Sequence, residues 1–234
     1  MITFKMVVNQ LSETMILLFD LDGTLIDSKK LISHALNHTL EKFGYRRLTE
    51  EEIINTINTP LREIFAIRAK REEIPKMREF YRRYYLEKCL PKTNIIPGIP
   101  ELLKELEENK IKTAVITTRN EKMAEHILKH FNLIEYVDTV VGHLDGRKIK
   151  PDPEPLFIAM DRLKGKTSSS IMIGDSPVDI EAGLQAECYA TIGVLWGFAS
   201  KEMLKKADFI VDNVADLKKT LTKLIKKRSV PELG

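Results

Sequence analysis

The sequence is poor in cysteine and has no long apolar run, and each scarcity excludes a class of protein. Its two cysteines, Cys89 and Cys188, cannot make a disulfide framework, so we expect a reducing compartment and a cytoplasmic location. The longest clean apolar stretch, Met15–Phe19, is far shorter than the roughly 18 residues of a membrane span. The N-terminus lacks a basic region followed by a long apolar one, so we expect no secretory signal. A membrane protein or a disulfide-rich secreted protein is therefore not expected.

An excess of charge of one sign is also missing. The 234 residues carry 37 Lys and Arg against 34 Asp and Glu, a formal net charge of +3. This is too weakly basic to indicate a nucleic-acid partner, and none is expected. Between Arg62 and Lys92 there are ten Lys or Arg against five Glu, which we interpret as a solvated helix face in preference to an anion-binding surface. Hydrophobic residues make up 43% of the chain, enough to bury a core.

Apolar patterns predict an α/β protein. Short apolar runs predict strands, and amphipathic segments between them predict helices. The expected strands are Met15–Phe19, Thr113–Thr117, Thr139–Val141, Ser170–Ile173, Ala190–Val194 and Phe209–Val211. The expected helices between and after them are Ile99–Asn109, Glu121–His130, Pro155–Leu163, Pro177–Ala186 and Val214–Ile225. Their alternation predicts a Rossmann-like parallel sheet covered by helices on both faces, while Met1–Val8 is either a short strand or an extension before the fold.

A second set of helices interrupts this alternation. The interval from Thr24 to Thr117 is about 60 residues longer than a strand–helix–strand unit requires. Its surplus is helical, with expected helices at Lys29–Phe43, Thr49–Asn55, Leu61–Ala69 and Pro75–Cys89. We therefore predict a core domain of residues 1–27 and 94–234, with an inserted helical domain of residues 28–93.

Four polar clusters lie at or just past the ends of expected strands. In open parallel sheets, ligands bind outside the carboxyl ends of the strands, so the clusters can converge on one site. They are Asp20-Leu21-Asp22-Gly23-Thr24, Thr117-Thr118-Arg119-Asn120, Lys150-Pro151-Asp152-Pro153 and Gly174-Asp175-Ser176-Pro177-Val178-Asp179.

Each cluster taken singly has a structural alternative. The first can be an Asp-rich turn. Thr118 with Glu121 can be a helix-capping pair, and Asp152 can cap a helix that has Pro153 at its first position. Ser176 and Asp179 can also form a cap, but that leaves Asp175 unexplained.

Electrostatics favours a shared site with a cation. Two carboxylates ~4 Å apart repel by ~4 kcal/mol at an effective dielectric constant of ~20. If Asp20, Asp22 and Asp175 crowd one pocket, either some protonate or a cation lies among them. Hard oxygen ligands suit Mg²⁺, which shares its coordination shell readily with phosphate, and Lys150 adds a second positive charge. The assembly would suit phosphoryl transfer.

Together the four clusters resemble the signatures of the haloacid dehalogenase-like superfamily. In chain order they are similar to its Asp-x-Asp-x-Thr signature, its Ser/Thr position, its Lys-Pro motif and its Gly-Asp-x-x-x-Asp motif. The inserted helices resemble the helical cap of the phosphoglycolate phosphatase-like branch. Further similar stretches are Asp-Gly-Thr-Leu-Ile-Asp-Ser at 22–28, Pro-Gly-Ile-Pro-Glu-Leu-Leu at 97–103 and Ala-Gly-Leu-Gln-Ala at 182–186.

The resemblance implies roles for the acidic and basic residues. Asp20 would be the nucleophile that forms an aspartyl-phosphate, and Asp22 would protonate the leaving oxygen and later take a proton from water. Lys150 would stabilise the nucleophile and the developing charge. Mg²⁺ would be held by Asp20, by the backbone carbonyl of Asp22 and by Asp175. Asp179 would bind the metal through water or orient Lys150, and both remain open.

The remaining implied roles concern the phosphoryl oxygens. Thr117 and Thr118 would hold them, together with the backbone near Gly23 and Thr24. Asp22 favours phosphoester chemistry, because the dehalogenases of the superfamily lack an acid two residues after the nucleophile.

The resulting hypothesis is a Mg²⁺-dependent phosphatase that acts on a small phosphorylated metabolite. The best guess for the substrate is 2-phosphoglycolate. Alternatives of the same fold are a pyrophosphatase, a sugar-phosphate phosphatase and a phosphosugar mutase, and an alternative of another class is a non-catalytic phosphate-sensing or protein-binding module. We expect a monomer or homodimer.

Some residues keep two interpretations. Arg119 departs from the branch, which usually has Thr-Asn where this chain has Thr117-Thr118-Arg119, and we interpret it as a surface charge in preference to a substrate contact. Arg62 is either a substrate contact of the cap or an ordinary helix-surface residue. The spaced histidine pairs His34/His38 and His126/His130 lack a third ligand, so no zinc site is expected.

Overall fold

A computed structural model describes residues 15–56 and 58–229, so the interpretation of Met1–Val8 lies outside the described residues. The chain divides into two compact units. One is formed by the chain up to Leu25 and from Ile95 onward, and the other is the segment Ile26–Asn94. The first unit contains all four polar clusters.

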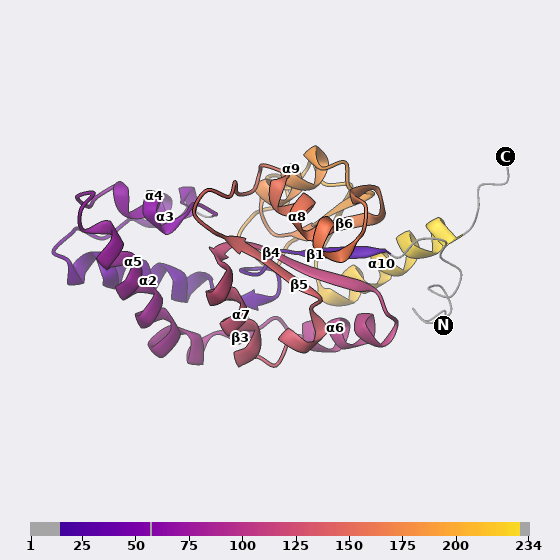
Figure 1. The fold of residues 1–234 in the computed structure, drawn as a ribbon, viewed down its shortest axis with the longest axis horizontal. Coiled ribbons are helices and arrows are strands. Elements are labelled where there is room, and N and C mark those ends of the chain that lie inside the picture. The colour runs from indigo at the N-terminus through magenta and orange to yellow at the C-terminus, as the bar shows by residue number, and fades with distance from the viewer. Residues whose placement is uncertain (1–14, 57, 230–234) are drawn as a thin grey trace. The chain divides into compact units, whose positions relative to one another are not determined.

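The first unit is built on six parallel strands (Figure 1). Strand β1 (Ile16–Phe19) pairs with β4 (Lys112–Asn120) on one side and with β6 (Ser170–Gly174) on the other. The full order is β5-β4-β1-β6-β7-β8, in which β5 is Thr139–His143, β7 is Ala190–Val194 and β8 is Phe209–Val211. The predicted Rossmann-like parallel sheet is confirmed. Because the chain leaves β1 toward β5 and returns to the opposite side of β1 with β6, the point where the strand order reverses lies at β1.

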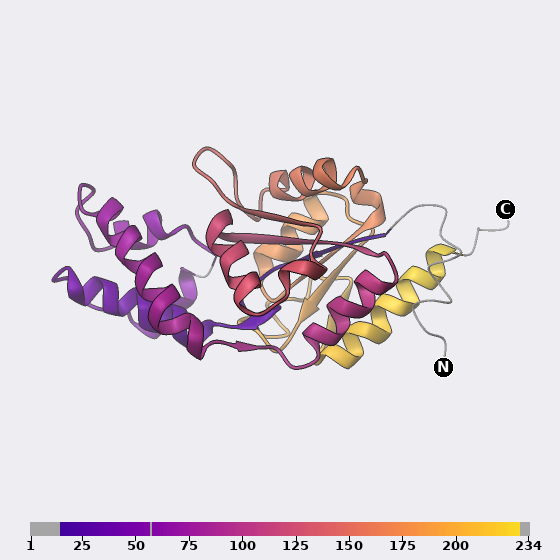
Figure 2. The same cartoon turned by 60° about the horizontal axis from the view of Figure 1, so that its bottom comes forward.

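Helices cover both faces of the sheet (Figures 1 and 2). On one face, α8 (Glu154–Leu163) and α9 (Pro177–Gln185) pack in one core with β1, where Ile16 and Leu18 are buried. Successive strand side chains alternate between faces, so Leu17 and Phe19 face the opposite side. The helices on that side are α6 (Ile99–Glu108), α7 (Glu121–His130) and α10 (Val214–Ser229). Burial on both faces explains why β1 consists only of apolar residues.

The second unit is helical. It contains α2 (Lys29–Lys42), α3 (Glu50–Asn55), α4 (Leu61–Ala66) and α5 (Ile74–Tyr84). Its core includes an aromatic row in which the ring of Tyr81 lies 6.2 Å from that of Phe65 and 6.1 Å from that of Tyr85. Two short strands, β2 (Ile26–Asp27) and β3 (Asn94–Ile95), pair where the chain enters and leaves this segment.

Differences from the predicted elements lie mainly at their ends. The helix expected to reach Ala69 ends at Ala66, and the one expected to reach Cys89 changes at Tyr85 to a π-helical turn that spans Tyr85–Cys89. Strand β4 continues to Asn120, three residues beyond the prediction, with an irregular register against β5 after Ile116. The short strands β2 and β3 were not predicted, because two residues give no periodic signal.

None of the helices within residues 15–56 and 58–229 combines the length and hydrophobicity that a membrane span requires.

Candidate active site

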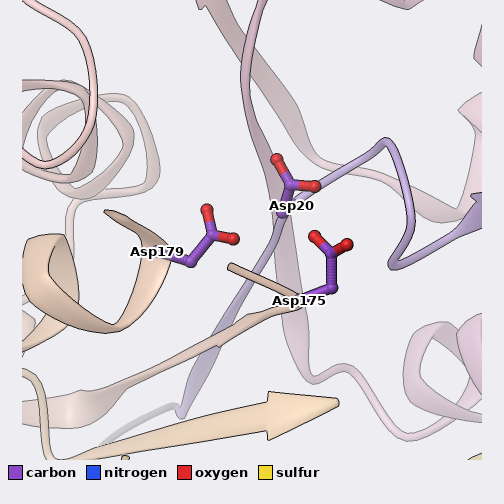
Figure 3. A group of neighbouring side chains, drawn as sticks. All are labelled: Asp20, Asp175 and Asp179. Carbon is purple, nitrogen blue, oxygen red and sulfur yellow. The ribbon is translucent and has the colours of Figure 1, made fainter. Parts of the chain in front are cut away.

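Three aspartates meet at the carboxyl ends of β1 and β6. Asp20 directly follows β1, and its backbone N–H donates to the carbonyl of Ile173 in β6 at 2.9 Å. Asp175 directly follows β6, and Asp179 lies in the first turn of α9. One carboxylate oxygen of each aspartate lies within 4.8 Å of those of the other two, and all three residues are buried (Figure 3). The sheet therefore brings together side chains that are far apart in sequence.

Lys150 provides the positive charge of this acidic cluster, by which we mean Asp20, Asp175 and Asp179. Its Nζ donates to Oδ1 of Asp20 at 2.7 Å and to the carbonyl of Ile116 at 2.7 Å. The same Nζ lies 2.6 Å from Oδ1 of Asp179. Its side chain is 1% exposed, so the ammonium group is fully inside the protein and is held by three oxygens.

The three carboxylates of this cluster outnumber the ammonium group that contacts them. Burial raises the pKa of Asp20 to about 7, with Asp179 adding to the rise and Lys150 opposing it. Burial, together with Asp20 and Asp179, raises the pKa of Asp175 well above its usual range. Burial opposes the charge of Lys150 as well, but Asp179 and Asp20 outweigh it and raise the pKa of the ammonium group. Full ionisation of the three carboxylates therefore requires a further cation beside Lys150.

The arrangement fits a divalent metal ion. Oδ2 of Asp20 is buried and has no hydrogen-bond partner among the described residues, although an unpaired buried carboxylate oxygen is costly. A divalent cation bound by the acidic cluster would neutralise the remaining charge and lower the cost of burying this oxygen. Carboxylate oxygens are the donors that Mg²⁺ prefers.

Asp179 has two structural roles at once. Its Oδ2 accepts hydrogen bonds from the backbone N–H and the hydroxyl of Ser176, which forms the capping box at the start of α9. Its Oδ1 pairs with Lys150. The expected helix cap is thus present, and the contact with Lys150 is one of the two roles left open for Asp179. Binding of the metal through water stays a prediction.

Asp22 lies outside the acidic cluster. Its carboxylate is held by Arg119, whose Nε donates to Oδ2 at 2.6 Å and whose Nη2 donates to Oδ1 at 2.8 Å. The interpretation of Arg119 as a surface charge is wrong, because its side chain is only 8% exposed. Strand β4 extends past Thr117 to Asn120, which pairs with His143 of β5, and from this extension the guanidinium of Arg119 reaches Asp22.

The expected phosphate-binding residues lie around the same strand ends. Thr117 is buried, and its Oγ1 accepts a hydrogen bond from the N–H of Arg119 at 3.1 Å. Thr24 is buried with no partner for its hydroxyl among the described residues. Gly23 has a φ of +88°, and a Cβ there would lie 2.2 Å from Oδ2 of Asp175, so a larger residue would displace the carboxylate. Thr118 is half-buried at the end of β4.

The structure shows what the two proposed capping residues, Glu121 and Asp152, contact. Glu121 accepts hydrogen bonds from Gly142 and Arg147, so its carboxylate is used to join α7 to β5. Asp152 does act as a local cap, because its Oδ1 accepts from the backbone N–H of Glu154 at 3.0 Å.

The loop after β7 is a part of the site that sequence reasoning missed. The backbone N–H of Phe198 donates to Oδ2 of Asp175 at 2.6 Å, and a Cβ on Gly197 would lie 2.2 Å from the same oxygen. The indole N–H of Trp196 donates to the carbonyl of Thr24 at 3.1 Å. Trp196 and Gly197 follow the predicted strand Ala190–Val194, which pairs with β6. Their place at that strand end could have indicated a loop that contributes to the site.

A parallel α/β core with a buried acidic cluster and a lysine at its strand ends is an arrangement suited to a hydrolase. The chain belongs to the haloacid dehalogenase-like hydrolase family, whose pattern matches residues 17–194.

Similar proteins are named as phosphatases or pyrophosphatases. The chain is 35% identical over 208 residues to the pyrophosphatase PpaX of Listeria monocytogenes, which covers 86% of this chain and 93% of that protein. It is 32% identical over 206 residues to the phosphoglycolate phosphatase of Aquifex aeolicus, and the match covers 88% of this chain and 96% of that protein. A crystal structure described as a "predicted phosphatase" from Clostridium acetobutylicum has a TM-score of 0.79 and 31% identity, covering 91% of this chain and all of that one. The chain is therefore an enzyme, a phosphatase of the haloacid dehalogenase-like type.

Proposed function

We propose that this enzyme hydrolyses a small phosphorylated metabolite through an aspartyl-phosphate on Asp20, with Mg²⁺ as the cofactor. One observation carries the proposal: Oδ1 of Asp20 is held by Lys150, while Oδ2 has no hydrogen-bond partner among the described residues. A carboxylate fixed through one oxygen presents the other as a nucleophile in a set orientation.

The proposed reaction has two steps. Oδ2 of Asp20 bonds to phosphorus while the bond to the leaving oxygen breaks, and Asp22 gives that oxygen a proton. Water then attacks phosphorus, Asp22 takes a proton from it, and the bond to Asp20 breaks to release inorganic phosphate. Lys150 keeps Asp20 in place, while Thr117, Thr118 and the backbone at Gly23 and Thr24 would hold the phosphoryl oxygens.

The metal would be held by Asp20 and Asp175 together with the backbone carbonyl of Asp22. When bound, it would offset the charge of the carboxylates and of the phosphoryl group. Asp179 contributes by holding Lys150 between itself and Asp20.

We further propose that residues 28–93 act as a cap that selects the substrate, as in the phosphoglycolate phosphatase-like branch, with residues 1–27 and 94–234 as the catalytic core. The separate compactness of Ile26–Asn94 supports this division. Arg62 is exposed on α4, and its contact with substrate stays a prediction. The expected cytoplasmic location and the monomeric or dimeric state also stay predictions.

For the substrate, 2-phosphoglycolate is the leading candidate and inorganic pyrophosphate the second. The second is favoured by the relatives named pyrophosphatase PpaX, which are as similar to this chain as the relative named phosphoglycolate phosphatase. Both compounds carry a second anionic group beside the scissile bond. A β-phosphoglucomutase from Clostridium difficile, at 22% identity and a TM-score of 0.77, shares the fold alone.

The deciding experiment measures phosphate release from 2-phosphoglycolate, pyrophosphate and a set of sugar phosphates, with Mg²⁺ or with EDTA. We expect Mg²⁺-dependent turnover, the highest kcat/KM for 2-phosphoglycolate, and loss of activity in Asp20→Asn. Turnover that requires a sugar bisphosphate activator would indicate a mutase. No turnover of any compound would support the phosphate-sensing or protein-binding module.

A further inference from the structure

The ion pair between Arg119 and Asp22 has a geometry that fixes orientation. Two parallel N–H groups of one guanidinium contact the two oxygens of one carboxylate, at 2.6 and 2.8 Å. Such a fork restrains both rotation and position, which a lysine cannot do with a single ammonium group. The two side chains are only 8% and 16% exposed, so solvent screens the pair weakly.

Arg119 is itself held from two further sides. Its backbone N–H donates to Oγ1 of Thr117, and its Nη1 lies 3.9 Å from Sδ of Met123 in α7. The backbone of Arg119 is therefore held by the expected phosphate-binding threonine, and its guanidinium also contacts the helix that follows. Through Arg119, the position of Asp22 depends on β4 as well as on the loop that carries Asp22.

We propose that Arg119 is a positioning residue for Asp22, one that sets the direction in which the proposed acid and base of the reaction faces the phosphoryl group. This inference rests on the proposed function. Each carboxylate oxygen has two lone pairs and the fork needs only one on each, so the fork itself does not prevent proton transfer at Asp22. Asp22 can thus remain held by Arg119 while it exchanges a proton with the leaving group or with water.

Two other roles for Arg119 make different predictions. If it bound an anionic group of the substrate, its loss would raise KM and leave kcat unchanged. If the ion pair served folding alone, its loss would lower activity in proportion to the loss of folded protein. A positioning role instead lowers kcat, and it does so only while Asp22 is present.

The test is a double-mutant cycle with Asp22→Asn, Arg119→Gln and the combined variant, assayed with 2-phosphoglycolate under saturating Mg²⁺. We expect Arg119→Gln to lower kcat by about 10- to 100-fold with little change in KM, a part of the roughly 100- to 10,000-fold that general acid–base catalysis supplies. In the Asp22→Asn background the same change should have no further effect. A further loss in that background, or a rise in KM alone, would overturn the proposal.

Burst kinetics with p-nitrophenyl phosphate provide a signature that a structural role would not produce. Nitrophenolate leaves without a proton, so the first step does not need Asp22, whereas the second step needs it as a base. Arg119→Gln should therefore release about one equivalent of nitrophenolate rapidly and then turn over slowly. Loss of the burst in parallel with the slow phase would contradict the inference.

Two controls make the result specific. Arg119→Lys keeps the charge without the fork and should behave like Arg119→Gln. Wild-type kcat in Arg119→Lys would refute a role in orientation. Arg119→Lys also takes the place of Arg119→Gln in the cycle if the Gln variant does not fold. Arg162→Gln removes an arginine that contacts Glu121 and the carbonyl of Val140, has no assigned role in the site, and should retain wild-type kcat with p-nitrophenyl phosphate. Failure of the proposed function is a separate outcome, because it would appear as unchanged activity in Asp20→Asn.

Discussion

Lys150 and Asp179 form an ion pair inside the protein, with 2.6 Å between Nζ and Oδ1 and side chains that are 1% and 0% exposed. The same ammonium group also contacts Asp20, so one cation serves two carboxylates while Asp175 lies beside them. Removal of one partner from a buried ion pair is far more destabilising than replacement of the whole pair, because the other charges stay buried without compensation.

Lys150→Met is therefore expected to lower the free energy of unfolding by about 3–5 kcal/mol in EDTA. Mg²⁺ should restore part of the loss, because a bound cation would offset the same carboxylates. Urea unfolding of both proteins, with EDTA and with Mg²⁺, measures the two effects. Lys148→Met is the matched control: Lys148 is exposed and pairs with Asp152, so this change should alter stability by less than about 1 kcal/mol. Equal stability of Lys150→Met and wild type in EDTA would contradict the expectation.

The contact of Gly197 with Asp175 leads to the second prediction. A methyl group at Gly197 would lie 2.2 Å from Oδ2 and 2.3 Å from Cβ of Asp175, so the carboxylate would have to move. Oδ2 also accepts the hydrogen bond from Phe198, which fixes the side chain in its present position. Gly197→Ala should weaken Mg²⁺ binding by about 10-fold or more, since displaced ligands and their supporting contacts typically cost that much in metal affinity. Isothermal titration with Mg²⁺ is the measurement.

Gly146→Ala separates this effect from a general loss of stability. Gly146 has a φ of +90° and no atom within 4 Å of the position that a Cβ would take. Its substitution strains the backbone by about 1 kcal/mol but leaves the site untouched, so Mg²⁺ affinity should be that of wild type. Equal affinities in Gly197→Ala and Gly146→Ala would show that Asp175 does not depend on Gly197.

The parts of the fold that were predicted well have a strong local signal. Ala190–Val194 and Glu121–His130 have the predicted bounds, because a buried apolar run and an amphipathic pattern are properties of contiguous residues. The end of β4 was not predicted. Thr118, Arg119 and Asn120 are polar and carry no apolar strand pattern, and the strand continues to Asn120 because this residue pairs with His143 of β5.

In the site, too, features with a local sequence pattern were predicted and contacts between residues far apart in sequence were not. Asp20 and Asp175 were predicted to meet because each ends a strand of one parallel sheet, and general topology then places them together. The pairing of Arg119 with Asp22 joins residues that are 97 positions apart and depends on how far β4 extends. The Phe198 hydrogen bond to Asp175 uses a backbone N–H, and no side-chain pattern indicates such a donor.

Glu121 connects the start of α7 to β5 through several donors. Its carboxylate accepts hydrogen bonds from the backbone N–H of Gly142 at 3.1 Å and from Arg147 at 2.6 Å, and it lies 3.3 Å from Arg162. Burial acts to raise the pKa of Glu121, but the hydrogen bonds from Arg147 and Gly142 outweigh it and hold the pKa below its ordinary value.

This shift predicts a pH-dependent contribution to stability. Because the pKa of Glu121 is lower in the folded than in the unfolded protein, the contribution is complete above the unfolded value of about 4.3 and is lost as the pH falls through the folded value. Glu121→Gln should therefore reduce the free energy of unfolding by about 1–3 kcal/mol at pH 7, and the difference from wild type should shrink steadily below about pH 4.5. Urea unfolding at a series of pH values from 7 to 3 measures it. Glu202→Gln removes an exposed carboxylate paired with Lys205 and should show a small difference from wild type throughout. A difference for Glu121→Gln that stays constant down to pH 3 would mean that the carboxylate charge does not hold α7 to β5.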